Sequence, residues 1–123
     1  MAKWSSDSVM DAALDVIAGC TLLTVCSAQP TTYAEASSTY KLADVVIDSG
    51  DFTKGNGDVS GRKVTVGAQN AVTIDASDTA THVALCVSGS STLVYVTTCT
   101  SQSLTAGGTV DVPAFDIEIA DPA

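Results

Sequence analysis

The chain has 123 residues, of which 46% are hydrophobic but only 5% aromatic. This length accommodates one domain, residues 1–123, whose core must be built mainly from small aliphatic side chains. The formal net charge is −9, and the five basic residues form no stripe, which argues against direct nucleic-acid binding. The N-terminal segment has no apolar run long enough for a secretion signal or a membrane span, so we expect synthesis in the cytoplasm and no membrane partner.

Residues 6–18 are predicted to form the one α-helix, with Asp7, Asp11 and Asp15 on one face. Its apolar stripe, on another face, consists of Val9, Met10, Ala13, Leu14 and Ile17. Gly19 can end this helix. Trp4, the only tryptophan, comes just before it. Two interpretations of Trp4 remain open: an anchor onto its own domain, or a residue that docks on a neighbouring subunit.

Residues 20–27 are predicted to be the first strand, which Pro30 ends. Thr32 and Glu35 have the spacing of a capping box, which predicts a short helix to about residue 38. Tyr33 and Tyr40 make this connection the most aromatic part of the chain, and we expect it to be an interaction loop.

The middle of the chain is predicted to contain short strands separated by turns. Residues 45–47 mark a second strand, and residues 54–58 form a polar, glycine-rich hairpin tip. Residues 62–68 and 71–76 alternate around Gln69 and Asn70, which predicts another hairpin.

The clearest signal is residues 80–99, where two β-branched runs flank a turn at residues 88–91. The last strand, residues 109–120, changes the parity of its apolar residues at Pro113, where a bulge or bend is expected. Together the pattern predicts a mainly β fold: an antiparallel β-sandwich or flattened barrel, with strands from about residue 20 to 120 and one N-terminal α-helix.

The four cysteines, Cys20, Cys26, Cys86 and Cys99, match no zinc-binding pattern. Two residues six apart on one strand lie ~20 Å apart, so Cys20 cannot bond to Cys26. With the hairpin turn centred between Gly89 and Ser90, Cys86 faces Leu93 and Cys99 faces Ala80. Cys86 and Cys99 are then also too far apart for a disulfide. Three alternatives remain: buried thiols, a bridge from the first strand to the hairpin, or bridges between subunits.

No pattern in the chain predicts catalysis, a cofactor or a metal ion. His82 is the only histidine and lies within a predicted strand, and no nucleophile elbow occurs. A cysteine nucleophile would need His82 from another strand, with Cys26 as the best candidate. The sequence therefore favours a protein that is not an enzyme.

Several runs of the sequence resemble a group of small proteins of tailed bacteriophages and prophages that are components of the virion. They are SAQPTTYAEA (residues 27–36), SGDFT (49–53), DVSGRKVTV (58–66), DASDTATHVAL (75–85), LVYVTTCTSQSLTAGG (93–108) and FDIEIADP (115–122). The resemblance covers nearly the whole chain and offers no active site to carry over. It implies a structural protein of the phage particle, made in the host cytoplasm.

Within that class, a small, acidic, β-rich chain is typical of a capsid decoration, or cement, protein, which binds the outside of the shell and stabilises it. The expected partners are the major capsid protein and further copies of the chain, with which it forms a homo-oligomer. Intersubunit disulfides are one way in which these copies could be joined. The first alternative is a tail, neck or head-fibre component, present in fewer copies. A carbohydrate-binding module is a further alternative, with Trp4, Tyr33 and Tyr40 as the candidate aromatic residues.

Overall fold

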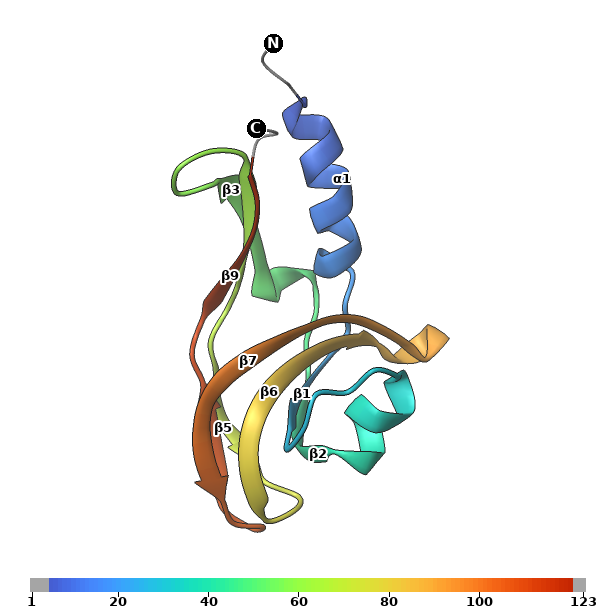
Figure 1. The fold of residues 1–123 in the computed structure, drawn as a ribbon, viewed down its shortest axis with the longest axis vertical. Coiled ribbons are helices and arrows are strands. Elements are labelled where there is room, and N and C mark those ends of the chain that lie inside the picture. The colour runs from blue at the N-terminus through green and yellow to red at the C-terminus, as the bar shows by residue number, and fades with distance from the viewer. Residues whose placement is uncertain (1–4, 121–123) are drawn as a thin grey trace.

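The structure is a computed structural model that describes residues 5–120. It is mainly β, with antiparallel sheets in a sandwich-like arrangement and one N-terminal α-helix, as predicted (Figure 1). The helical elements are α1 (Asp7–Ala18), the π-helix η1 (Glu35–Thr39), and the short 3-10 turns η2 (Ser49–Asp51) and η3 (Ser88–Ser90). The strands are β1 (Leu22–Cys26), β2 (Lys41–Val46), β3 (Phe52–Asn56), β4 (Arg62–Val66), β5 (Gln69–Thr73), β6 (Asp78–Val87), β7 (Thr92–Leu104), β8 (Thr109–Val112) and β9 (Phe115–Ile119).

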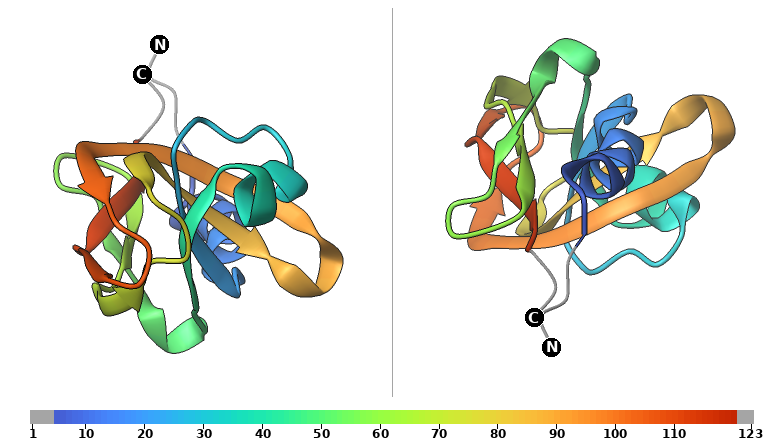
Figure 2. Two further views of the ribbon diagram at one scale, coloured as in Figure 1. Left: turned by 90° about the horizontal axis from the view of Figure 1, so that it is seen from below. Right: turned by 90° about the horizontal axis from the view of Figure 1, so that it is seen from above.

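The largest sheet has the strand order β2-β1-β6-β7, so the predicted hairpin is its second half. Strand β6 is central, and four consecutive residues, 83–86, are buried because both faces of the sheet are covered there. Strand β7 is an edge strand and is mostly exposed or half-buried. Figure 2 shows it (orange) along the outer margin of the molecule in both views.

The register of this hairpin was only partly predictable. Cys86 lies opposite Leu93, as expected, but Ala80 lies opposite Gln102 and not opposite Cys99. Two irregularities in the pairing, one between Ala80 and His82 and one between Leu85 and Cys86, shift the strands past each other. A count from the turn cannot detect such bulges.

The prediction of a hairpin around Gln69 and Asn70 was wrong. Strands β4 and β5 do not pair with each other; β4 pairs with β3 and β9, whereas β5 pairs with β8. The chain therefore makes no hairpin at these residues. The C-terminal segment pairs with both strands: β9 with β4, from the Arg62–Ile119 pair, and β8 with β5, to the Thr73–Thr109 pair. The Gln69 amide donates to Asp51 Oδ1 at 3.0 Å, which links this segment to the turn before β3.

Pro113 lies between β8 and β9, where the C-terminal segment passes from one small sheet to the next. Proline has no backbone N–H, so it cannot continue a ladder of hydrogen bonds. The predicted irregularity at Pro113 is confirmed, but the prediction of one last strand over residues 109–120 was wrong, because β8 and β9 are separate strands in different sheets.

Helix α1 packs beside β3 and β4 (Figure 1). Met10 and Leu14 are its buried residues. The acidic face also has partners, which the sequence did not reveal: Asp11 Oδ1 accepts from Arg62 Nε at 2.9 Å, and Asp15 accepts from Lys54 Nζ. These ion pairs join the helix to the β3–β4 hairpin.

Two apolar clusters lie on opposite faces of the large sheet. The main core includes Leu14, Leu23, Val64 and Leu85 and fills the space between that sheet, α1 and the smaller sheets. The second cluster is small and is built on Cys26, Ala36, Ala84 and Cys86, with half-buried aromatic and aliphatic residues around it. Ala36 belongs to η1, so this short helix covers the second face.

Candidate interaction surface

A hollow lies between β7 and the C-terminal strands. Two adjoining cavities of about 200 and 300 Å³ share Val83, Cys99, Thr100, Val112 and Pro113 in their walls. We call this hollow, with the five shared residues, the β7 groove. Its walls are mostly apolar, and it lies where the core-facing side of β1, β6 and β7 is opposite β8 and the start of β9.

β7 contributes a continuous stretch to the wall of the groove. Residues 97–100 of β7 are consecutive in the wall of the larger cavity. Successive side chains of a strand point to opposite faces, so Thr97 and Cys99 share one face and Thr98 and Thr100 share the other.

All four cysteines are free thiols, and Cys20, Cys26 and Cys86 are fully buried. Burial raises the pKa of Cys20 and of Cys86 to about 11, and also raises that of Cys26. The structure contains no bridge from the first strand to the hairpin among these thiols. Cys99 is the one cysteine that is partly exposed, and it lies in the β7 groove. In the folded chain, Cys99 is therefore accessible for a disulfide bond between subunits, whereas the three buried thiols are not.

Cys26 lies directly opposite His82 on the neighbouring strand, the pair that a cysteine nucleophile would require. The environment of the thiol is unsuited to that chemistry. Cys26 is completely buried, and its Sγ donates to the Ala36 carbonyl at 3.6 Å. Burial raises the pKa of the Cys26 thiol, which favours the neutral form, whereas a nucleophilic cysteine requires a lowered pKa. His82 Nδ1 is engaged with Thr81 Oγ1 at 2.8 Å.

The candidate aromatic residues do not form one platform. Tyr33 and Tyr40 flank η1 and are half-buried, packed against the second cluster. The predicted short helix between them is confirmed: the Glu35 N–H donates to Thr32 Oγ1, and the Glu35 carboxylate accepts from Thr31. These hydrogen bonds from Thr31 lower the pKa of Glu35. Both tyrosines thus have a packing role in the fold. Trp4 lies outside the described residues.

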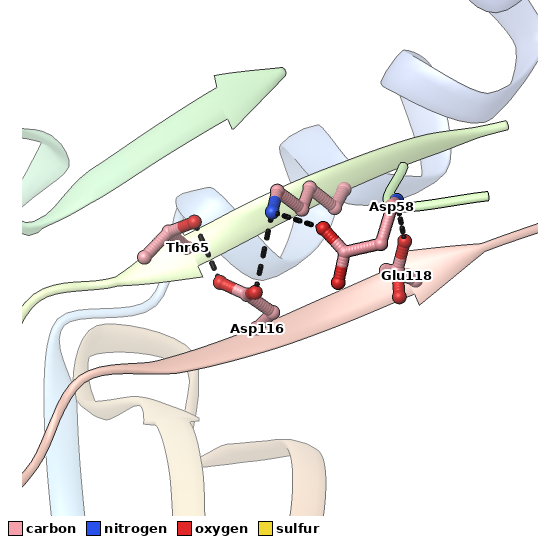
Figure 3. A network of polar contacts seen from close by, with 5 residues as sticks. Asp58, Thr65, Asp116 and Glu118 are labelled. Carbon is pink, nitrogen blue, oxygen red and sulfur yellow. Dashed lines mark hydrogen bonds and ion pairs between the residues drawn. The ribbon is translucent and has the colours of Figure 1, made fainter. Parts of the chain in front are cut away.

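The charged side chains of the small sheets form ion pairs and hydrogen bonds within these sheets. Lys63 on β4 contacts Asp58 at 2.8 Å and Asp116 at 3.3 Å, while Thr65 donates to Asp116 at 2.7 Å (Figure 3). Glu118 accepts from the backbone N–H of Asp58 at 2.6 Å. The Thr65 and Lys63 hydrogen bonds lower the pKa of Asp116. This network fastens the 57–61 turn to β9.

Every basic residue in the described part of the chain makes an ion pair with a carboxylate: Lys41, Lys54, Arg62 and Lys63. No group of three or more potential metal-ligating side chains occurs among residues 5–120. None of the helices there is long and apolar enough to cross a membrane.

The sequence did not reveal the β7 groove. Its walls come from β1, β6, β7, β8 and the start of β9, so finding it requires the strand order. The one signal available was the charge pattern, since Asp, Glu, Lys and Arg are all absent between Asp78 and Asp111. That stretch contains β6 and β7.

The chain matches no protein-family model, no curated protein sequence and no solved structure.

Proposed function

We propose that this chain is a capsid decoration protein of a tailed bacteriophage, which binds the outer surface of the shell and stabilises it. The observation that carries the proposal is the resemblance to small phage virion proteins, spread over six runs from residue 27 to residue 122. The proposed partners are the major capsid protein and neighbouring copies of the chain.

Two features of the structure support a role in protein–protein contact. The β7 groove offers apolar side chains, and β7 is an edge strand of the large sheet. Large apolar side chains are exposed on other elements: Val9 and Val16 on α1, and Val46 on β2. A shell protein makes many such contacts in a repeated array, so each can be weak while the assembly holds firmly.

Quantitative mass spectrometry of purified particles tests this proposal by measuring the molar ratio of this chain to the major capsid protein. A decoration protein gives a ratio near one or a simple fraction such as one third. A ratio of a few per cent supports the tail, neck or head-fibre alternative. Absence of the chain from the particle contradicts both.

Cys99 adds a test of how the shell is held together. A particle assembles in a reducing cytoplasm and is released into oxidising surroundings, where dissolved oxygen can accept two electrons and two protons from a pair of thiols. We predict that Cys99, and none of the buried thiols, forms this intersubunit bond. A reductant should then lower the thermal stability of wild-type particles and leave particles that carry Cys99→Ser unchanged. Equal stability of wild-type particles with and without reductant contradicts the prediction.

A further inference from the structure

We propose that the β7 groove of one copy of this chain binds the indole of Trp4 from a second copy, and that two copies exchange this contact as a dimer. Lys3, beside Trp4, then lies near the acidic rim of the same groove. The inference concerns the isolated chain and does not depend on the proposed role in a phage particle.

The β7 groove has a buried apolar floor and an exposed rim. Val25, Val83 and Val112 of the floor are buried, whereas Thr100 and Pro113 at the rim are exposed. Its two cavities are about 200 and 300 Å³, and each is at or below the lower end of the ~300–1,000 Å³ typical of small-molecule sites. The groove therefore suits one large side chain better than a small-molecule ligand.

The aromatic residues of the chain leave Trp4 as the candidate for this groove. The other five all pack against the apolar clusters of the fold: Phe52, Tyr95 and Phe115 against the main core, and Tyr33 and Tyr40 against the second cluster. Phe115 also lines the larger cavity, so an indole in the groove would meet an aromatic ring, and such rings pack favourably in offset or edge-to-face arrangements.

Helix α1 begins at the far end of the molecule from the β7 groove (Figure 1). Its Asp11 bonds to Arg62, which lies opposite Ile119 at the end of β9. One turn later, Asp15 bonds to Lys54, two residues nearer to the groove along the β3–β4 pairing. The helix therefore approaches the groove as it proceeds, and its first turn lies farthest away.

Trp4 cannot reach the groove of its own chain. Ser5 precedes Asp11 by six residues, or ~9 Å along the helix, and Asp116 of the groove wall lies three residues from Ile119, or ~10 Å along β9. Together these steps make ~19 Å, whereas Trp4 with its side chain extended reaches only ~10 Å from Ser5, because consecutive Cα atoms are ~3.8 Å apart. A groove within reach of this indole must belong to another copy.

Charge favours the same contact. With a net charge of −9, two copies repel each other unless the contact brings a cation to a carboxylate. All the basic residues in the described part are ion-paired within the chain, and the fifth one, Lys3, is the neighbour of Trp4. Asp111 and Asp116 line the groove, and Asp111 accepts from the Ala71 N–H but makes no ion pair among the described residues.

Two copies that lie side by side and antiparallel satisfy both contacts at once. Because the start of α1 and the groove lie at opposite ends, a twofold axis brings each Trp4 to the groove of the other copy, and twofold dimers are the commonest assemblies. Once one contact has formed, the second is intramolecular and reinforces it. The indole would cover Cys99, so the Cys99 disulfide and the Trp4 contact are alternative uses of one groove.

The test uses the purified chain in reductant and combines sedimentation equilibrium with the fluorescence of Trp4, the only tryptophan. Trp4→Ala removes the indole, and Thr100→Arg places a large charged side chain at the exposed rim of the groove. The matched control is Thr53→Arg, the same change at an exposed residue of β3. Circular dichroism verifies that each variant is folded.

At ~100 µM the wild type and the control should be dimeric, with emission at shorter wavelength than in dilute protein, and both groove variants should dimerise at least tenfold more weakly. A wild type that stays monomeric overturns the proposal, as does a dimer that survives Trp4→Ala or Thr100→Arg.

Mixing the two variants gives a second measurement. The Thr100→Arg chain keeps its indole and the Trp4→Ala chain keeps its groove, so the mixture should emit at shorter wavelength than the Thr100→Arg chain alone. Emission that changes neither on mixing nor with the concentration of the wild type overturns the proposal and assigns Trp4 to its own domain.

Discussion

Gly61 is the residue at which the backbone leaves least room for substitution. Its φ is +73°, and a Cβ at this position would lie 1.9 Å from the carbonyl oxygen of Ile119. Gly107 provides a matched comparison, because its φ is +91° but a Cβ would meet nothing within 4 Å. The two positions therefore separate the cost of a left-handed conformation from the cost of a steric clash.

We predict that Gly107→Ala lowers the free energy of unfolding by about 1–2 kcal/mol, the usual cost of a left-handed conformation in an alanine. Gly61→Ala should lower it by more, because the end of β9 must also move. Denaturant unfolding followed by circular dichroism measures both values. Equal losses in the two variants would show that the Gly61–Ile119 contact relaxes freely.

Single residues also mark where the sequence was informative about the site. The β-branched residues before and after residues 88–91 predicted the hairpin, and Thr32 with Glu35 predicted η1. The position of Cys99 relative to β6 was not predictable, because bulges depend on packing across the sheet.

Among the elements, α1 depends on charges that lie far from it in the chain. Asp11 is bonded to Arg62, and this hydrogen bond lowers the pKa of the carboxyl below its usual range. A carboxyl whose pKa is lower in the folded than in the unfolded chain stabilises the fold above its unfolded pKa of ~3.9. That contribution disappears as the pH falls through the folded pKa.

We therefore predict that Asp11→Asn lowers the Tm at pH 7 and that its difference from wild type shrinks as the pH falls below ~4. Differential scanning calorimetry across this range measures the effect. Asp78→Asn is the control, since the Asp78 carboxylate accepts from the adjacent Thr79 N–H and makes no ion pair among the described residues. A Tm difference for Asp11→Asn that persists unchanged at low pH would contradict the assigned ion pair.

The same element shows what periodicity can and cannot reveal. The apolar stripe correctly predicted that Met10 and Leu14 face the core. It also included Val9, which is 63% exposed. The stripe did not predict any partner for the acidic face of the helix. Lys54 and Arg62 lie 39 and 51 positions from their aspartates, and no local pattern connects residues at such distances.

For the whole molecule, the sequence predicted the fold class but not which strands pair. Alternation is a property of each strand, whereas pairing depends on contacts between residues far apart in the sequence, such as those between β4 and β9. The β7 groove depends on that pairing and could not be predicted for the same reason. The absence of charge between Asp78 and Asp111 was visible from the start, but its meaning depended on learning that β7 lies at an edge.

The C-terminal segment has a consequence for how the chain is made. β8 and β9 are the partners of β5 and β4, and the Thr65–Asp116 pair joins residues 51 positions apart. Strands β4 and β5 are translated before these partners, and contacts so distant in sequence form slowly, so this part of the fold closes late. Until β8 and β9 are in place, the strong negative charge keeps newly made chains apart while β4 and β5 lack these partner strands.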